Sequence, residues 1–331
     1  MIYISDNYTD PYFNLAEEEY LFYHFKEPIF RLWQNDNAII VGKNQNTLSE
    51  INYDYVKENN IKVVRRLTGG GAVYHDLGNL NYTFIEHYSK KESVEDMFER
   101  FTRPIIDALN SLGVKAYLEG RNDLMIDGKK FSGNAVAIEK GRILQHGTLL
   151  FESNFDILSN ALLSKPEKFQ DKAVKSNIKR VTNIREHLNQ SKDTRDIGWF
   201  KDFLGNWVCT HIEGIKQYTL TEEDVKNIEK IAREKYSADR WNYNYSPKYT
   251  FHNKARFKGG SVEVYISVEE GIIKSVEFFG DYFFLNPTEN FAKEFIGITY
   301  SKEEIAKKIS TLKTSAYFSN ISENEILDLM T

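Results

Sequence analysis

The chain has 331 residues, with 43 Lys and Arg against 48 Asp and Glu, and its formal net charge is −5 at pH 7. That balance argues against a general nucleic-acid-binding protein, which normally carries a strong basic excess. A single cysteine excludes an internal disulfide, and neither a secretory leader nor an apolar run long enough for a membrane span is present. We therefore expect a soluble cytoplasmic protein, and the length predicts two domains.

The first predicted element is a helix that begins at Asp10-Pro11 and runs to His24. Asp is a good cap and Pro is favoured at the first helical position. Glu17, Glu18 and Glu19 fall in the early turns of this helix, where acidic side chains interact favourably with the helix dipole.

A run of three glycines, Gly69–Gly71, is the most informative feature of the chain. It lies between an expected buried strand that ends at Arg65-Arg66 and an expected strand at Asn81–Ile85. Backbone N–H groups of such a loop can bind an anion, and arginine forks suit phosphate or carboxylate. The alternative is an ordinary flexible turn. His75 and Asp76 follow, either to orient the loop or as an ordinary hydrogen-bonded turn pair.

The next segments predict helices inserted between hairpin-linked strands. A helix opens at Ser93 and ends at Gly113, with a kink or break expected at Pro104. Residues 122–152 read as strands joined by tight turns at Asp127-Gly128 and Glu139–Gly141. This order predicts an α+β fold with a largely antiparallel sheet.

The remaining chain divides into a basic segment, a helix, a linker and a small α/β unit. Residues 164–180 favour either a solvated surface or a mobile basic segment that closes over phosphate. Residues 238–250 predict a linker, so we place the domains at 1–246 and 247–331. In the second domain, Ser261–Val268 and Ile272–Phe279 should pair, and capped helices should begin at Ser301 and Ser322.

Several motifs, in this order and spacing, resemble those of the lipoate–protein ligase A family in the biotin/lipoate ligase superfamily. They are Asp10–Glu19, Leu32–Gln34, Val41–Asn46, Arg66-x-x-Gly-Gly-Gly-Ala-Val-Tyr-His-Asp, Gly120–Leu124, Lys130–Ala135, His146–Leu150 and Val181–Asn183. The resemblance implies a core like that of class II synthetases and biotin ligases, with a mixed, largely antiparallel sheet and flanking helices. It extends more weakly to a small α/β C-terminal domain.

The residues themselves exclude several common chemistries. The chain has no Walker phosphate loop, no dinucleotide fingerprint after a strand, and no metal-ligand spacing among its seven histidines and Cys209. What remains is a set of cations and N–H donors, which suits the activation of a carboxylate with ATP. Catalysis of that step is electrostatic and positional.

The resemblance implies an ATP-dependent lipoate–protein ligase that makes lipoyl-AMP and passes the lipoyl group to an acceptor lysine. The implied acceptors are lipoyl domains of 2-oxo acid dehydrogenase acyltransferase subunits and the glycine-cleavage H protein, with ATP and Mg²⁺ as cofactors. We expect a monomer without nucleic-acid or membrane partners. Two alternatives stay open: an octanoyl or lipoyl transferase using an acyl-thioester, and a non-catalytic binder of lipoyl-AMP. The transferase needs a catalytic cysteine, and Cys209 is expected to be a buried structural thiol.

By the same resemblance, Lys130 is the catalytic residue that contacts acyl carboxylate and phosphate, while Lys129 is a surface lysine. Arg66 is assigned to phosphate or adenylate, and Arg65 to packing. Asn122 and Asp123 could serve adenine or Mg²⁺, with Asp123 the candidate metal ligand, or could cap local structure; His146 could line the pocket or be structural. The expected ATP- and lipoyl-adenylate-binding set is Arg66, Gly69, Gly70, Gly71, Ala72, Val73, Tyr74, His75, Asp76, Asn79, Asn122, Asp123, Lys130, Ser132, Gly133, His146, Gly147 and Thr148.

Overall fold

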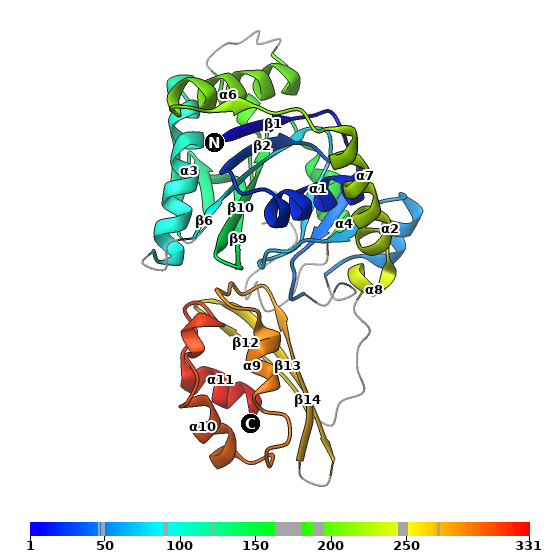
Figure 1. Ribbon diagram of the computed structural model, residues 1–331, viewed down its shortest axis with the longest axis vertical. Helices are drawn as coiled ribbons and strands as arrows, with labels where there is room; N and C mark the ends of the chain where they lie inside the picture. The colour runs from blue at the N-terminus through cyan, green and yellow to red at the C-terminus, as the bar shows by residue number, and fades with distance from the viewer. Residues whose placement is uncertain are drawn as a thin grey trace.

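A computed structural model describes residues 1–45, 47, 50–88, 92–120, 122–162, 181–188, 195–243, 251–269 and 272–331. Figure 1 shows a larger N-terminal body above a smaller C-terminal body. The basic segment expected at 164–180 and the predicted domain boundary lie outside the described residues, so both stay predictions. Within the described residues, no helix combines the length and apolar character of a membrane span.

The N-terminal body alternates strands with helices, of which Pro11–His24 and Val94–Ser111 were predicted, whereas Ile197–His211 was not and Asp239–Asn242 lies in the stretch predicted as a linker. In chain order its elements are β1 (Ile2–Ser5), α1 (Pro11–His24), β2 (Ile29–Trp33), β3 (Ala38–Val41), α2 (Tyr53–Glu58), β4 (Lys62–Arg65), β5 (Val73–His75), β6 (Asn79–His87), α3 (Val94–Ser111), β7 (Ala116–Glu119), β8 (Asp123–Ile126), β9 (Lys129–Glu139), β10 (Arg142–Leu150), α4 (Phe155–Ala161), η3 (Ile184–His187), α6 (Ile197–His211), β11 (Lys216–Gln217), α7 (Glu222–Ile231), η4 (Ala232–Tyr236) and α8 (Asp239–Asn242).

Among the described residues, the main sheet has the strand order β11-β1-β2-β6-β10-β9-β8-β7. Neighbouring strands from β2 to β7 are antiparallel, whereas β1 runs parallel to β2 and to β11. A second sheet has the order β4-β3-β5. The α+β prediction is confirmed.

Two predicted hairpin turns are confirmed by their backbone. Asp127 and Gly128 have φ values of 49° and 73°, and Lys140 and Gly141 have values of 51° and 74°. Positive φ at both central residues is the two-residue turn that matches the twist of antiparallel strands. These turns fold β8, β9 and β10 into one continuous antiparallel ribbon, which carries Lys130 and His146.

Helices cover both faces of the main sheet (Figure 1). One hydrophobic cluster joins α3 and α6 to the side chains of Phe30 and Leu32 on β2. Ile29, on the same strand, belongs to a separate cluster that contains α1. The period of two along β2 therefore sends alternate side chains to opposite helical layers.

The helix α3 has the predicted cap but no break. Ser93 and Asp96 form a reciprocal capping box, and the helix continues through Pro104 to Ser111. Of the kink or break predicted at Pro104, the break is wrong and the kink stays a prediction. Phe101 and Ile105 are both buried against the sheet, and such tertiary packing outweighs the hydrogen bond that an internal proline removes.

The C-terminal body is a three-stranded antiparallel sheet, β12-β13-β14, covered by helices. Two of its helices begin at the predicted caps Ser301 and Ser322. No strand was predicted at Phe251–Phe257, which forms the edge strand β12 and pairs with β13. The elements are β12 (Phe251–Phe257), β13 (Gly260–Glu269), β14 (Ile272–Gly280), α9 (Thr288–Lys293), α10 (Lys302–Ile309), η5 (Thr314–Ala316) and α11 (Glu323–Met330).

The segment after β14 joins the two bodies. The Gly280 amide donates a hydrogen bond to the carbonyl oxygen of Asn44. The ring of Phe283 lies edge-on to Phe98 of α3 at a centroid distance of 5.5 Å, and Phe283 is 1% exposed. This packing inserts the 281–283 segment beside the glycine loop.

Candidate active site

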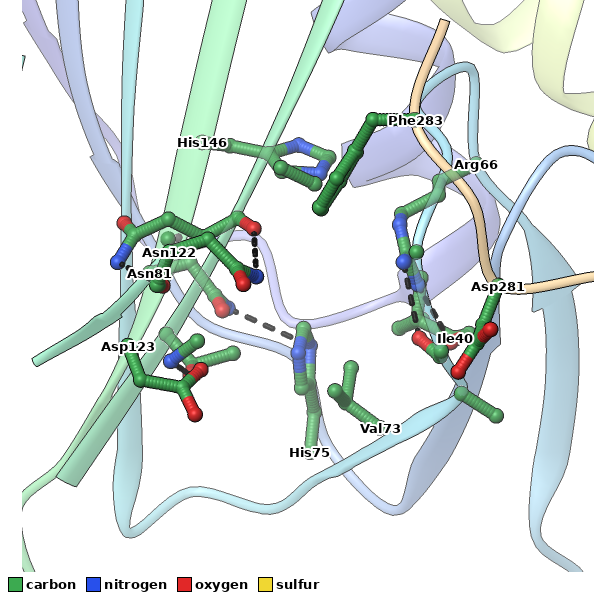
Figure 2. Close-up of a pocket in the computed structure, with 18 of the residues that line it drawn as sticks. Ile40, Arg66, Val73, His75, Asn81, Asn122, Asp123, His146, Asp281 and Phe283 are labelled. Atoms are coloured by element: carbon green, nitrogen blue, oxygen red, sulfur yellow. Dashed lines mark hydrogen bonds between the residues drawn. The ribbon is translucent and has the colours of Figure 1, made fainter. Parts of the chain in front are cut away.

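A cavity of about 470 Å³ lies between the main sheet, the glycine loop, the β8–β9 turn region and the segment after β14 (Figure 2). Figure 2 shows that its labelled side chains come from strands far apart in sequence and converge on one space. Of the predicted set, the cavity is lined by Arg66, Gly70, Gly71, Ala72, Val73, His75, Asn122, Asp123, Lys130, Gly133, His146, Gly147 and Thr148.

Five predicted residues do not line this cavity. Tyr74 lies between Val73 and His75 on β5, so its side chain points to the opposite face, where its hydroxyl donates to Asn37. Asp76 holds a turn instead, since its carboxylate accepts from the amides of Gly78 and Asn154. That interaction is the turn role left open for Asp76 by the sequence.

The other three are also structural in this geometry. A Cβ built on Gly69 would lie 2.6 Å from the carbonyl oxygen of Tyr282, so this glycine permits close packing of the C-terminal body. The Asn79 amide donates to Asn81, and the fully buried Ser132 hydroxyl accepts from Asn134.

The glycine loop is held in shape by Arg66. Its guanidinium donates to the carbonyl oxygens of Ile40, Gly69 and Gly71 at 2.9, 2.6 and 2.9 Å. Gly70 has a φ of 90°, which a side chain would strain. Burial lowers the pKa of Arg66 to about 10, so the group is still positive at neutral pH.

Arg65 packs, as the sequence predicts. Its side chain donates to carbonyl oxygens of Gly42, Lys43, Gln45 and Trp241, and it is 2% exposed. The two adjacent arginines thus stabilise two different loops. After them, the chain forms the short strand β5 before β6, so His75 ends a strand and does not simply close the glycine loop.

Lys130 lies at the exposed end of the cavity. Its ammonium forms an ion pair of 2.7 Å with Asp123, and the two side chains are 37% and 39% exposed. The Gly133 amide donates to the hydroxyl of Thr148 at 3.1 Å, which ties β9 to β10 beside the lysine. Lys129 is exposed and does not line the cavity.

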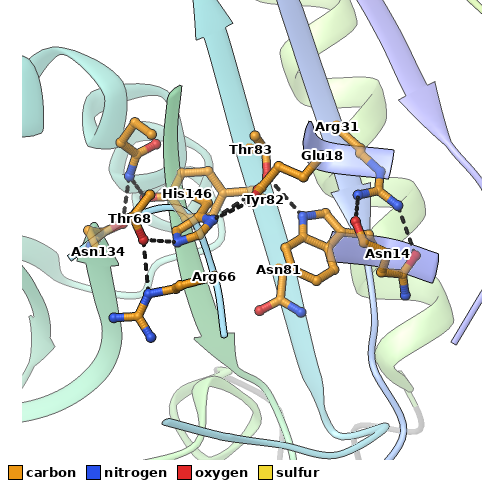
Figure 3. A network of polar contacts seen from close by, with 12 residues as sticks. Asn14, Glu18, Arg31, Arg66, Thr68, Asn81, Tyr82, Thr83, Asn134 and His146 are labelled. Carbon is orange, nitrogen blue, oxygen red and sulfur yellow. Dashed lines mark hydrogen bonds and ion pairs between the residues drawn. The ribbon is translucent and has the colours of Figure 1, made fainter. Parts of the chain in front are cut away.

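His146 lines the cavity and is also fully engaged with its neighbours (Figure 3). Its Nδ1 lies 2.9 Å from the Glu18 carboxylate, and its Nε2 lies 2.8 Å from the hydroxyl of Thr68. The same hydroxyl accepts from Arg66 at 2.9 Å. A continuous polar chain therefore joins α1 to the glycine loop. His146 and Thr83 hold the pKa of Glu18 below its ordinary value against the opposing effect of burial.

The acidic run at 17–19 has a role that the sequence reasoning missed. The helix dipole interpretation was wrong, because the first turn of α1 holds no acidic residue. Glu17 and Glu18 are buried at 0% exposure and pair with Arg31 and His146, while Glu19 pairs with Lys235 at 2.6 Å. Three consecutive carboxylates point to different sides of a helix, and that was the available signal that some must be buried.

Other residues of the cavity were not predicted. Arg256, Asp281 and Phe283 come from the C-terminal body, and no local pattern places a distant segment over a pocket. Asn122, by contrast, was predicted: it lines the cavity, and its side chain donates to the Asn134 carbonyl oxygen at 2.7 Å. Its role toward adenine or Mg²⁺ stays a prediction. The residues added by the structure are Trp33, Ile40, Asn81, Asn134, Ala135, Arg256, Asp281 and Phe283.

Cys209 lies on α6 and does not line the cavity. The prediction that this thiol is buried was wrong: Cys209 is exposed, while its neighbour Val208 is fully buried. The segment around Cys209 forms a helix with one buried side and one exposed side. Val208 lies on the buried side and Cys209 on the exposed side.

Within the described part of the chain, no three His, Cys, Asp or Glu side chains cluster in a way that could hold a metal ion. Two carboxylates line the cavity, those of Asp123, which pairs with Lys130, and of Asp281. Mg²⁺ is commonly held by one or two carboxylates together with substrate phosphates. This donor set therefore fits a magnesium ion that arrives with a nucleotide and does not fit an all-protein metal site.

Comparison with known proteins matches both bodies. Residues 10–204 match the family model of the lipoyl protein ligase A/B catalytic domain, and residues 246–330 match that of the bacterial lipoate protein ligase C-terminus. The chain is 41% identical to lipoate-protein ligase LplJ of Bacillus subtilis, over 100% of both chains. It is 41% identical to lipoate–protein ligase 1 of Staphylococcus aureus, over 98% of each.

Solved structures agree with these relatives. The LipL1 protein of P. falciparum in complex with lipoate superposes with a TM-score of 0.77 at 27% identity, covering 99% of this chain and 97% of that one. A lipoate-protein ligase A bound with ATP superposes with a TM-score of 0.62 at 28% identity, covering 73% and 99%. The fold, the convergence of the glycine loop with Lys130, and the matches over both bodies establish that the chain belongs to the lipoate–protein ligase family.

Proposed function

We propose that this chain activates lipoate with ATP to form lipoyl-AMP and then transfers the lipoyl group to a lysine of an acceptor protein. The observation that carries the proposal is that Lys130 and the glycine loop line one cavity. Both elements belong to the stretch that matches the ligase catalytic domain. Two of the similar structures hold the two substrates, lipoate and ATP.

In the first half-reaction, a lipoate carboxylate oxygen attacks the α-phosphorus of ATP, and pyrophosphate leaves. Two anions must approach each other, so the barrier is largely electrostatic. We assign Lys130 to offset the charge that develops between carboxylate and phosphate, and the N–H groups of Gly70–Gly71 to bind phosphate oxygens. Leaving Asp123 costs Lys130 little, because exposed ion pairs contribute at most about 1 kcal/mol.

In the second half-reaction, the acceptor amine attacks the acyl carbonyl carbon, AMP leaves, and the amine loses a proton. Lys130 is suited to stabilise the departing phosphate in this step as well. Mg²⁺, when bound through the nucleotide, would neutralise triphosphate charge, with Asp123 as the candidate protein ligand.

The cavity also suits the organic part of the substrate. Trp33, Ile40 and Val73 give it an apolar side, opposite the strands that carry Lys130 and Asp123. Lipoate has the same division into an apolar chain and a terminal carboxylate. A pocket with mostly apolar walls and a few placed polar groups is typical of small-molecule sites.

We propose lipoyl domains of 2-oxo acid dehydrogenases and the glycine-cleavage H protein as acceptors. A solved archaeal relative from Thermoplasma acidophilum is a bi-partite lipoate protein ligase studied with its E2 lipoyl domain. The transferase alternative has no support from the site, because the exposed Cys209 lies outside the cavity.

The function is tested by incubating the full chain with a purified lipoyl domain, lipoate and ATP, and measuring the mass of the acceptor. We expect the mass of one lipoyl group to be added only when ATP is present. A lipoyl-thioester donor without ATP serves as the control for the transferase. Acceptor modification from the thioester alone, or lipoyl-AMP binding without any turnover, would refute the ligase.

A further inference from the structure

His75 is buried in the cavity wall with one ring nitrogen bonded and the other without a partner. It is 3% exposed, and it ends β5 with its ring facing the cavity (Figure 2). Its Nδ1 lies 3.1 Å from the side-chain nitrogen of Asn35 and 3.5 Å from that of Asn81. Its Nε2 has no hydrogen-bond partner among the described residues.

A chain of obligatory donors and acceptors determines the direction of each bond that leads to His75. Arg31 can only donate, and it donates to Oδ1 of Asn14 at 2.8 Å. The Asn14 amide nitrogen then donates to the carbonyl oxygens of Tyr8 and Gln34, which can only accept. This orientation of Asn14 is therefore doubly determined.

The same reasoning passes through Asn35 to the imidazole. Oδ1 of Asn35 lies 2.9 Å from the Asn14 nitrogen, which shares its two hydrogens among three oxygens. The opposite orientation would place two amide nitrogens in contact, so the Asn35 nitrogen faces His75. Nδ1 of His75 consequently accepts, and the ring proton resides on Nε2. The Asn81 nitrogen lies 3.5 Å from the same Nδ1. The cavity thus holds a neutral N–H donor with nothing to donate to.

The position of this donor identifies the part of the substrate that it meets. His75 lies beside Trp33, at a ring-centroid distance of 6.1 Å, and beside Asn81 on β6. Lys130 is on β9, and β10 separates that strand from β6. Two strand spacings correspond to about 10 Å. An acyl chain whose carboxylate is held at Lys130 can therefore extend across the cavity to the strand beside His75.

We propose that the Nε2–H of His75 donates a hydrogen bond to a dithiolane sulfur and so selects lipoate over octanoate, an inference that rests on the proposed ligase function. Octanoate ends in a methyl group and leaves the buried donor unpaired, which is costly. A site built to hydrogen-bond one substrate rejects the analogue that lacks the acceptor. Sulfur is a weak acceptor, so we expect a preference of about tenfold from this contact.

The experiment measures kcat/KM of the full chain for lipoate and for octanoate with one purified lipoyl domain. In His75→Phe, which keeps a ring but removes the donor, the lipoate-to-octanoate ratio should fall about tenfold. His75→Gln offers an amide donor and should retain part of the ratio. An equal loss for both substrates, or an unchanged ratio, would overturn the proposal. Wild type that ligates neither acid would instead refute the ligase function.

A measurement on the wild-type chain does not depend on how the variants fold. Nitrogen NMR of histidine-labelled protein should show His75 as a neutral ring protonated at Nε2. Lipoate should shift the Nε2 resonance more than octanoate does. A ring protonated at Nδ1, or identical shifts with both acids, would contradict the proposal.

Discussion

The two ends of the cavity differ in their exposure to water and in the freedom of their charges. At one end, the Lys130–Asp123 pair is more than one-third exposed on both sides. The other end is lined by His75. Behind it, outside the cavity lining, Arg31 and Glu17 form a pair of 2.5 Å with both side chains at 0% exposure, and Arg31 begins the polar contacts that lead to His75. The exposed end can exchange partners during a reaction, whereas the buried end cannot.

This difference separates catalysis from recognition. A lysine that must contact a carboxylate, then a phosphate, benefits from a weak resting partner in water. A group that must recognise a substrate benefits from being fixed in advance, because ordering it then costs nothing on binding. Substitutions at the two ends should therefore have different consequences: stability and selectivity at the buried end, and rate at the exposed end.

The largest expected effect is on stability, from Arg31→Met. The change removes the partner of Glu17, whose pKa burial raises to about 8 even beside Arg31, and it removes both donors to Asn14. Breaking one side of a buried pair costs about 3–5 kcal/mol of unfolding free energy, measured by urea denaturation. Lys62→Met is the matched control, since it breaks a 2.8 Å pair with Asp10 that is largely exposed, and it should cost less than about 1 kcal/mol. Equal losses of unfolding free energy in the two variants would contradict the distinction between the buried pair and the exposed one.

The next effect is on rate, from Lys130→Ala. Lipoate-dependent exchange between ATP and pyrophosphate should fall by at least ~10², the scale for losing one preorganised donor. Its unfolding free energy should change little, because the side chain is 37% exposed and its ion pair within the described residues is the exposed one with Asp123. The neighbouring exposed Lys129→Ala provides the control and should exchange at the wild-type rate. Normal exchange by Lys130→Ala would show that the lysine is not catalytic.

The smallest effect is a pH dependence at the buried end. Burial, with further contributions from His146 and Arg66, lowers the pKa of His75 to about 3, against about 6.5 in an unfolded chain. Between these values the unfolded chain binds a proton that the folded chain does not, so stability falls as the pH falls.

From about pH 7 to about pH 5, this histidine should remove up to about 2 kcal/mol of unfolding free energy. The loss should be absent from His75→Phe, so the difference between the two proteins isolates it from the carboxylates. Urea denaturation at both pH values tests this, and parallel losses in the two proteins would argue that the His75 ring is not held neutral by burial.

Local sequence signals predicted much of the fold. The caps at Asp10, Ser93, Ser301 and Ser322 and the turn at Asp127-Gly128 were read correctly, because each depends on a few neighbouring residues. The motif resemblance also brought the glycine loop, Lys130 and His146 into one predicted site, and the structure places all three on one cavity.

What the sequence did not predict depends on long-range packing. Phe283 reaches the cavity only because the segment after β14 packs against α3. The burial of Glu17 and Glu18 depends on strands that lie 14 and 128 residues away along the chain. Cys209 was misplaced because the helical face that it occupies is set by the packing of α6. The same long-range packing leaves one nitrogen of His75 without a hydrogen-bond partner in the part of the chain that the structure describes.

The central claim is that one substrate spans the cavity from the exposed lysine to the buried histidine. A crystal structure of the full chain with a non-hydrolysable lipoyl-AMP analogue tests it most directly. We predict that the acyl-phosphate group contacts Lys130 and that a dithiolane sulfur lies within hydrogen-bond distance of Nε2 of His75. An adenylate bound with its dithiolane ring away from His75, or with Lys130 still paired to Asp123 and out of reach, would contradict the account.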